Sequence, residues 1–246
     1  MISVCIATYN GEKYIGEQLA SILPQLGPND EVVISDDGST DGTLTVIGLQ
    51  GDDRIRLFEG PQRHSPIHNF ENALRHAKGD YIFLADQDDV WKPNKVEVCM
   101  RWLETYGCVV SDAEVTNAGL RPMFPSLYNI MYVREGRWYN MLWKNGYTGC
   151  CMAFDRKILE WSLPFPVDIP MHDIWIGNVA ASMDRVKFLP DKLVYFRRHS
   201  DVASCNVNGS RYSRWQQIIF RWHVVKNIFL LKIKACKFRF HKTKPI

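Results

Sequence analysis

Three aspartates crowd the stretch FLADQDDVW, directly after an apolar run. Residues 81–85 have the composition of a buried strand, and Asp86, Asp88 and Asp89 follow it. Carboxylates this close repel one another unless a cation or water lies between them. Carboxylate oxygens are the ligands that Mg²⁺ and Mn²⁺ prefer. The stretch therefore predicts a divalent-cation site at a strand end, with a solvated turn before the next helix as the alternative.

Two further acidic loops end apolar segments of the chain. Asp36 and Asp37 follow one strand-like run, and His172 and Asp173 follow a second apolar segment. An aspartate-rich turn on its own is commonly a cap or an Asx-turn. However, loops that end successive strands of one parallel sheet face the same crevice, where open α/β sheets bind ligands. We therefore expect these acids to share one site.

Glycine-rich phosphate loops are missing from the sequence. Neither G-x-x-x-x-G-K-[ST] nor G-x-G-x-x-G after the first strand occurs. Both motifs hold phosphates through backbone N–H groups. If the site takes a phosphorylated ligand, we expect a metal ion to hold the phosphates.

The elements that would position the acids alternate between strands and helices. Apolar runs predict strands at residues 2–7, 31–35, 55–58, 81–85, 186–189 and 193–196. Apolar spacing and polar caps predict helices at 15–26, from an Asp41 cap to 47, at 69–76 and from 173 onward. Residues 117–137 are expected to form a long loop. This alternation predicts an α/β fold with a mainly parallel sheet flanked by helices.

Charge is distributed unevenly along the 246 residues. Residues 211–246 contain ten Lys or Arg and no Asp or Glu, whereas residues 1–210 contain 20 basic and 27 acidic residues. We therefore expect a catalytic domain at 1–210 and a basic tail at 211–246. Seven scattered cysteines without a C-x-x-C pair, and no recognisable secretion signal, indicate reduced thiols in a cytosolic compartment.

Apolar residues recur at helical spacing in the basic tail. The main stripe comprises Trp215, Ile218, Trp222, Val225, Phe229, Ile233, Cys236 and Phe240. Phe220, Val224 and Leu231 lie off this stripe, so one folded surface could hardly cover every apolar residue. The pattern predicts a helix that binds an anionic membrane surface, with packing on the domain as the alternative. Nucleic acid is the lesser alternative partner for this basic helix, because nothing else in the chain indicates nucleic-acid binding.

Four segments together resemble glycosyltransferase family 2, which has the GT-A fold. They read VCIATYNGEKYIGEQLASIL, EVVISDDGSTDGT, NALRHAKGDYIFLADQDDVW and TGCCMAFDRKIL, and the resemblance runs from about residue 2 to residue 200. It implies a nucleotide-sugar site made of Thr8, Tyr9, Asn10, Asp36, Asp37, Asp86, Gln87 and Arg198. It also implies that Mn²⁺ or Mg²⁺ binds to Asp86 and Asp88 of a D-x-D motif and to His199. The late Tyr-Arg-x-His-like element that supplies Arg198 and His199 leaves the register open by one residue.

The same resemblance implies that Asp173 is the catalytic base. Members of the family usually carry a Glu-Asp pair there, whereas this chain has His172-Asp173, so the first position departs from the pattern. The alternative for Asp173 is a helix N-cap without a catalytic role.

The resemblance implies an inverting, metal-dependent glycosyltransferase of bacterial surface polysaccharide synthesis. The donor would be a UDP- or dTDP-linked sugar, and the acceptor a lipid-linked saccharide at the inner face of the cell membrane. The ADQDDVW stretch (residues 85–91) resembles rhamnosyltransferases, so a deoxyhexose is one possible sugar. The alternatives are a nucleotidyltransferase, which would need an early glycine-rich phosphate loop, and a non-catalytic nucleotide- or cation-binding module.

Overall fold

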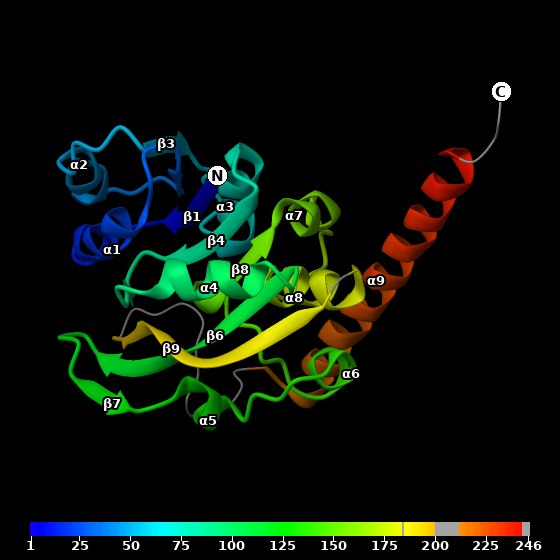
Figure 1. Ribbon diagram of the computed structural model, residues 1–246. Coiled ribbons are helices and arrows are strands. Elements are labelled where there is room, and N and C mark those ends of the chain that lie inside the picture. The colour runs from blue at the N-terminus through cyan, green and yellow to red at the C-terminus, as the bar shows by residue number, and fades with distance from the viewer. Residues whose placement is uncertain (184, 200–211, 243–246) are drawn as a thin grey trace.

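One sheet of nine strands forms the centre of the protein. The computed structural model describes residues 1–183, 185–199 and 212–242, with side chains described through residue 234. Within these residues the strand order is β3-β2-β1-β4-β8-β6-β9-β5, and β7 pairs with β6 (Figure 1). The strands are β1 Ile2–Thr8, β2 Glu31–Asp36, β3 Ile55–Glu59, β4 Tyr81–Asp86, β5 Val90–Trp91, β6 Cys108–Asn117, β7 Pro122–Phe124, β8 Met152–Asp155 and β9 Val186–Arg198.

Helices connect and cover these strands. They are α1 Ile15–Ile22, α2 Thr43–Gly48, α3 Pro66–His76, α4 Lys95–Leu103, α5 Leu127–Met131, α6 Arg137–Leu142, α7 Arg156–Ser162, α8 His172–Met183 and α9 Arg214–Lys242, with 3₁₀ turns η1 Leu23–Gln25 and η2 Gly149–Cys151. α3 packs on β1 and β2, and α4 packs on β6, β8 and β9.

The sheet is mainly parallel, as the alternating sequence pattern predicts. β1 pairs in parallel with β2 and β4, β2 with β3, and β6 with β9. β8 is antiparallel to both β4 and β6, so β6 and β9 run in the same direction as β4. The central strands are buried on both faces, which is why their sequences are continuous apolar runs. The predicted α/β fold with a mainly parallel sheet flanked by helices is confirmed.

Several predicted element boundaries were wrong, each for a local reason. The first helix ends at Ile22, because Pro24 opens a 3₁₀ turn instead of continuing it. Gly42 caps α2, while the carboxylate of Asp41 accepts a hydrogen bond from the Thr43 N–H at 3.0 Å. The strands expected at 186–189 and 193–196 are one strand, β9, interrupted by a register shift opposite Asp112. The predicted loop 117–137 contains β7 and α5.

The C-terminal helix α9 packs on the domain with its first half and then extends away from it (Figure 1). Val224 and Ile228 are buried, and α9 contacts α6 and α8. The Asp168 carboxylate accepts a hydrogen bond from Asn227 Nδ2 at 2.6 Å and pairs with Lys226. The predicted domain boundary between residues 210 and 211 lies outside the described residues and stays a prediction. Among the described helices, none combines the length and apolar character needed to span a bilayer.

Candidate active site

The register of the parallel strands brings the predicted polar residues to one edge of the sheet. Thr8 at the end of β1 pairs with Asp36 at the end of β2. On the other side of β1, Ala7 pairs with Asp86 at the end of β4. The acids of two loops that are 50 residues apart in the sequence therefore lie at the same carboxyl edge, as expected for a parallel sheet.

Asp36 and Asp37 hold loops in place through hydrogen bonds. The Asp36 carboxylate accepts hydrogen bonds from Thr8 Oγ1 at 2.8 Å and from the N–H and Oγ of Ser39 at 2.8 and 2.6 Å. The Asp37 carboxylate accepts hydrogen bonds from the N–H groups of Arg63 and Ser65 at 3.1 and 3.0 Å. Both aspartates are buried, so their oxygens set the shape of the loops that follow β2 and β3.

The loop after β4 is clamped to the loop after β1. The Gln87 amide accepts a hydrogen bond from the Tyr9 N–H at 3.0 Å and donates one to the Tyr9 carbonyl at 3.1 Å. Asn10 has a positive φ of 48°, and its Oδ1 accepts a hydrogen bond from the Thr40 N–H at 2.8 Å. These contacts leave the Tyr9 ring partly exposed, with its centroid 4.5 Å from that of His64.

Asp86, Asp88 and Asp89, at the end of β4 and in the loop after it, form a centre of closely spaced carboxyl groups, called here the acidic centre. Burial and the nearby carboxylates of Asp88 and Asp173 raise the pKa of Asp86 to about 7. Burial and the charges of Asp88 and Asp86 likewise raise the pKa of Asp89 well above its usual range. Asp89 Oδ2 is buried and has no hydrogen-bond partner among the described residues. The centre is therefore short of positive charge.

His199 and Arg197 reach this centre from the end of β9. His199 Nε2 lies 2.8 Å from Asp88 Oδ2. The Arg197 N–H donates to Asp89 Oδ1 at 2.8 Å, and its guanidinium donates to the Glu17 carboxylate at 2.5 Å. Arg197 and His199 line the cavity described below, and Arg198, which lies between them on β9, does not. Alternate strand residues point to opposite faces. If the arginine of the Tyr-Arg-x-His-like element is placed one residue earlier in the sequence, it is Arg197 instead of Arg198.

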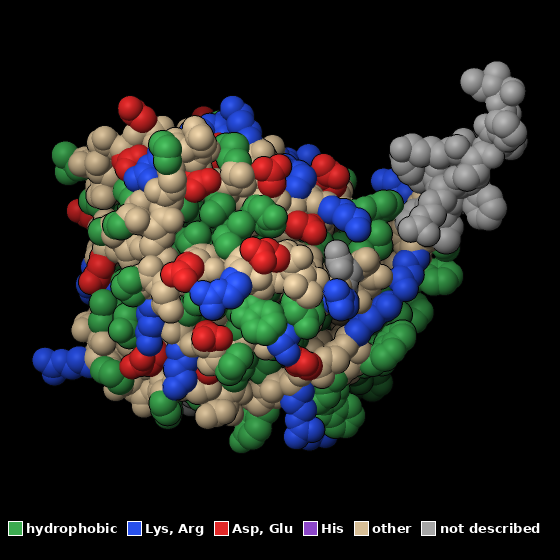
Figure 2. All heavy atoms as spheres, viewed as in Figure 1, with side chains coloured by type: hydrophobic (Ala, Val, Ile, Leu, Met, Phe, Trp, Pro, Cys, Tyr) green, Lys and Arg blue, Asp and Glu red, His purple; other side chains and the backbone are tan. Residues whose placement is uncertain are grey.

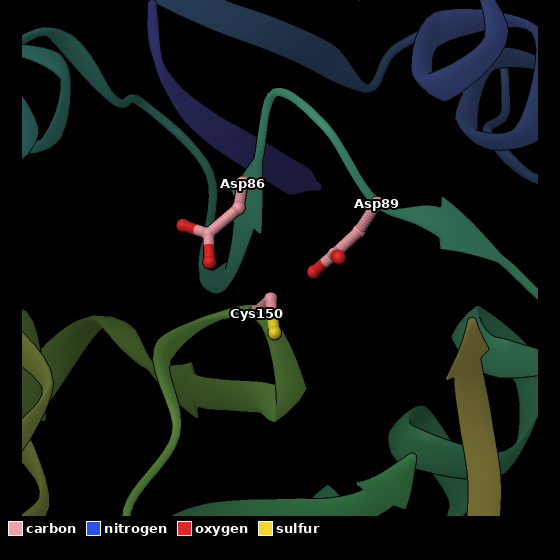
Figure 3. A group of neighbouring side chains, drawn as sticks. All are labelled: Asp86, Asp89 and Cys150. Carbon is pink, nitrogen blue, oxygen red and sulfur yellow. The ribbon is translucent and has the colours of Figure 1, made fainter. Parts of the chain in front are cut away.

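The donor atoms of this centre suit a hard divalent cation. Asp86, Asp88 and His199 offer carboxylate oxygens and an imidazole nitrogen, and the orphaned Asp89 oxygen adds negative charge beside them. Asp86, Asp89 and Cys150 also have ligand atoms within 4.8 Å of one another, with Cys150 across the β4–β5 loop on η2 (Figure 3). A hydrogen bond with Cys151 and burial raise the pKa of Cys150, so it remains a thiol and contributes no charge.

A buried lysine offsets part of the negative charge. Lys95 is fully buried at the start of α4, and its Nζ donates to the Cys150 carbonyl at 2.5 Å. The same Nζ lies 4.4 Å from the centroid of the Trp91 ring. Its charge acts to lower the pKa of Asp86, against the effect of burial. Sequence reasoning missed Lys95, because nothing in the local pattern marks this lysine as buried.

Asp173 lies in the first turn of α8, where it faces η2. Its Oδ2 accepts a hydrogen bond from the Gly149 N–H at 3.1 Å, and its Oδ1 accepts one from the Ile174 N–H at 2.7 Å. Burial raises the pKa of Asp173 to about 6. This carboxylate is therefore a stronger base than an exposed aspartate, and it is ionised near neutral pH.

His172 differs sharply from its neighbour. Its ring stacks on Phe70 with centroids 4.0 Å apart, and neither ring nitrogen has a hydrogen-bond partner among the described residues. Burial lowers the pKa of His172 to about 3. The imidazole is therefore neutral and a poor proton acceptor, which leaves Asp173 as the base of this pair.

A cavity of about 1130 Å³ joins these groups. One wall, called here the sheet wall, is formed by Thr8, Tyr9, Asn10, Asp37, Asp86 and Asp88. The cavity is also lined by Gln87, Asp173 and His199. Its helical wall is formed by Ile130, Met131, Asn140, Lys144, Phe220 and Arg221, from α5, α6 and α9 and the residues next to them. Of the predicted site residues, Asp36 and Arg198 do not line the cavity. The helical wall was not predicted, because α6 and α9 meet only in the folded chain.

Comparison with known proteins gives the same family as the sequence resemblance. A model of glycosyl transferase family 2 matches residues 3–161. The Escherichia coli UDP-Glc:alpha-D-GlcNAc-diphosphoundecaprenol beta-1,3-glucosyltransferase WfgD is 28% identical over 169 residues, which cover 67% of this chain and 64% of WfgD. Both acidic strand ends, at Asp36 and Asp86, lie within the matched family model.

Two solved structures share the fold. Staphylococcus aureus TarS 1-349 in complex with UDP-GlcNAc has a TM-score of 0.67 at 20% identity, over 94% of this chain and 66% of that chain. The mannosyltransferase PcManGT from Pyrobaculum calidifontis, in complex with GDP-Man and Mn²⁺, has a TM-score of 0.59 at 25% identity, over 79% of this chain and 56% of that chain. The chain spans less than two thirds of the length of WfgD and of both structures. Because the family model matches more than half of the sequence, this chain belongs to glycosyl transferase family 2.

Proposed function

We propose that this protein is an inverting glycosyltransferase of bacterial surface polysaccharide synthesis, which transfers a sugar from a nucleotide-diphosphate donor to a saccharide acceptor. The observation that carries the proposal is Asp173: a buried carboxylate with a raised pKa lines the same cavity as the acidic centre at Asp86 and Asp88. A base and a site for a charged diphosphate are the two parts that such a transfer needs.

The sheet wall is the proposed donor site. Thr8, Tyr9 and Asn10 and the Asp36-Asp37 loop would surround the nucleotide, and the partly exposed Tyr9 ring offers a surface on which a base can stack. The fold shared with TarS in complex with UDP-GlcNAc supports a UDP- or dTDP-linked sugar. The sugar itself, hexose or deoxyhexose such as rhamnose, is left to the donor screen below.

Mn²⁺ or Mg²⁺ would be held by Asp86, Asp88 and His199. When bound, this cation would neutralise the negative charge that builds up on the departing diphosphate. Lys95 is a fixed cation beside the same centre, and the backbone N–H of Arg197 adds a neutral donor to Asp89. The Mn²⁺ in the PcManGT complex, a protein of the same fold, supports the assignment.

Asp173 would take the proton of the attacking acceptor hydroxyl. As the hydroxyl oxygen bonds to the anomeric carbon of the donor sugar, the bond from that carbon to the diphosphate oxygen breaks. The hydroxyl proton moves to a carboxylate oxygen of Asp173, and the nucleoside diphosphate leaves. The Gly149 N–H holds Asp173 Oδ2 in position, so the carboxylate is oriented before the substrates bind.

A donor screen tests this proposal directly. The chain is incubated with Mn²⁺ and nucleotide sugars that vary in base and in sugar, and released nucleoside diphosphate is measured with and without EDTA. We expect slow release from one class of donor, and loss of release in EDTA. Release of inorganic pyrophosphate from a nucleoside triphosphate and a sugar phosphate would instead indicate a nucleotidyltransferase. Binding without any product would indicate a non-catalytic module.

The activity is expected to rise with pH through an acid limb near pH 6. Asp173 acts as a base only when deprotonated, so below its pKa of about 6 the rate should fall about tenfold per pH unit. Above this pH the rate should level off. The measurement is kcat/KM for the donor at constant saturating Mn²⁺. A rate that stays constant down to about pH 4.5 would contradict the assignment of Asp173.

The acceptor is proposed to be a lipid-linked saccharide, so the protein would work at the inner face of the cell membrane. The name of WfgD, which specifies a diphosphoundecaprenol acceptor, supports this class. The two apolar stripes of α9 also support it. The stripe with Val224 and Ile228 packs on the domain, whereas the stripe with Trp215, Ile218 and Trp222 is exposed. Basic and apolar side chains run side by side along α9 (Figure 2), which is typical of a helix that binds an anionic membrane.

Replacing both exposed tryptophans of α9 by glutamine is expected to weaken membrane binding by about tenfold or more. Trp215 and Trp222 are 76% and 63% exposed, so their replacement removes interfacial aromatic rings without disturbing the core. The measurement is flotation of the full chain with phosphatidylglycerol vesicles, where about 0.5 M salt should also weaken binding.

The matched control for this variant is Leu49→Gln, directly after α2, where the side chain is 78% exposed and remote from α9 (Figure 1). Vesicles of phosphatidylcholine control for lipid charge. Truncation at Ser210 is a poor test, because it would also remove the buried residues Val224 and Ile228. Equal flotation of the double tryptophan variant and the unchanged chain would refute the membrane role of α9.

A further inference from the structure

The helical wall of the cavity is cationic, in contrast to the acidic sheet wall. Lys144 and Arg221 both line it. Among the described residues, the carboxylates that line the cavity come from the end of β4, from the loops after β2 and β4 and from Asp173 of α8, and none comes from the helical wall. Two positive charges therefore face a large cavity from a wall that carries no opposite charge of its own, which favours an anionic ligand.

Arg221 contacts the backbone next to Lys144, and contacts hold both side chains in place. Arg221 Nη2 of α9 donates a hydrogen bond to the Trp143 carbonyl at 2.7 Å, which places α9 beside the residue that precedes Lys144. Lys144 Nζ lies 4.3 Å from the centroid of the Tyr132 ring. Asn140 Oδ1 accepts a hydrogen bond from the Gly146 N–H at 2.8 Å, so the turn that carries Lys144 is closed by a side chain.

This pair of cations is linked to the catalytic base by a short segment. Gly149, whose N–H donates to Asp173 Oδ2, is five positions after Lys144 in the sequence. Even a fully extended chain would place the Cα atoms of Lys144 and Gly149 at most about 18 Å apart. Asp173, Lys144 and Arg221 line the same cavity, so a saccharide that presents a hydroxyl to Asp173 can reach Lys144 and Arg221 with the group at its other end.

We propose that Lys144 and Arg221 bind the diphosphate of a lipid-linked saccharide acceptor. This inference rests on the proposed transferase function and adds a second diphosphate site, separate from the donor site at Asp86 and Asp88. The site is formed where α6 and α9 meet, next to the exposed side chain of Trp143. The lipid chain would leave the cavity there, in the direction of the membrane. α9 thus has two tasks, since it supplies a phosphate-binding arginine and a membrane-binding stripe.

Binding of farnesyl diphosphate, measured by calorimetry, tests this site. EDTA is present throughout, so that the diphosphate cannot bind through a divalent cation at the acidic centre. We expect the double variant Lys144→Gln, Arg221→Gln to bind farnesyl diphosphate at least about tenfold more weakly, because two charge-assisted contacts are lost. Farnesol lacks the phosphates, so its weak binding should be the same for both proteins.

The matched control is Arg214→Gln, Lys232→Gln, which removes two exposed charges of α9 that do not line the cavity. This control should bind farnesyl diphosphate as the unchanged chain does. Equal binding by the Lys144 and Arg221 variant would overturn the proposal. An equal loss of farnesyl diphosphate binding in the control variant would also overturn the proposal, because binding would then depend on the overall charge of α9 and not on these two side chains.

Two further arms separate the possible sources of the anion. Inorganic diphosphate is expected to bind more weakly than farnesyl diphosphate, since it lacks the lipid chain. Phosphatidylglycerol vesicles should bind the Lys144 and Arg221 variant nearly as well as the unchanged chain, and a selective loss of vesicle binding would overturn the assignment to the acceptor. Donor hydrolysis by the unchanged chain tests the transferase function separately, so either idea can fail without the other.

Discussion

Replacing Asp173 with asparagine is expected to lower kcat by at least about 100-fold, with little change in donor binding. General-base catalysis contributes a factor of this size, and the asparagine side chain cannot accept the hydroxyl proton. The fold should survive, because asparagine Oδ1 can still accept one of the two hydrogen bonds that the Gly149 and Ile174 N–H groups donate to Asp173. The measurement is steady-state transfer to the acceptor, together with the donor Kd from calorimetry.

His172→Phe is the matched control for this variant. Phenylalanine keeps the stack on Phe70 and removes two ring nitrogens that have no hydrogen-bond partner among the described residues. Because burial lowers the pKa of His172 to about 3, the histidine does not serve as the base, and its replacement should reduce kcat far less. If Asp173→Asn mainly weakened donor binding and left kcat near the original value, the base would have to be another group.

Replacing Asp88 with asparagine is expected to reduce cation-dependent turnover by more than about 100-fold while the protein stays folded. A bound cation supplies several kcal/mol of charge stabilisation in such reactions, and this substitution removes one of its anionic ligands. Mn²⁺ binding, measured by calorimetry, should weaken in parallel. Retained Mn²⁺-dependent turnover would rule out Asp88 as a ligand.

The same substitution should leave thermal stability in EDTA unchanged or higher. The charge of Asp88 raises the pKa of both Asp86 and Asp89, which means that the three carboxylates repel one another in the folded protein. Asparagine removes that repulsion, and its Oδ1 can still accept a hydrogen bond from His199 Nε2. Asp80→Asn is the control, since Asp80 is an exposed aspartate that pairs with the N-terminus.

Much of the fold followed from local sequence pattern. The apolar runs that end at Ser35 and Ala85 are buried strands, and the acids after them lie at one edge of the sheet. The strands could be predicted because a strand buried on both faces needs an unbroken apolar run. The shared position of the acids could be predicted because parallel strands end at a common edge of the sheet. The continuity of β9 through Pro190 and Asp191 was missed, since it depends on pairing with the partner strand β6, which accommodates these residues by a register shift.

The chemical types at the site were also predictable, while their individual roles were not. The sequence by itself determined that acids follow β2 and β4, that Asp173 begins a helix and that the tail has more apolar residues than one face can bury. Only the tertiary structure decided that Asp36 holds a loop, and that Arg197 reaches the acidic centre.

Tertiary structure alone also decided that α9 completes the cavity with Phe220 and Arg221. The physical reason is the range of the interactions. Strand and helix formation depends on neighbours within a few residues, and so it can be read along the chain. Burial, pKa shifts and cavity walls depend on groups that are far apart in the sequence, and these meet only when the sheet and the helices have packed.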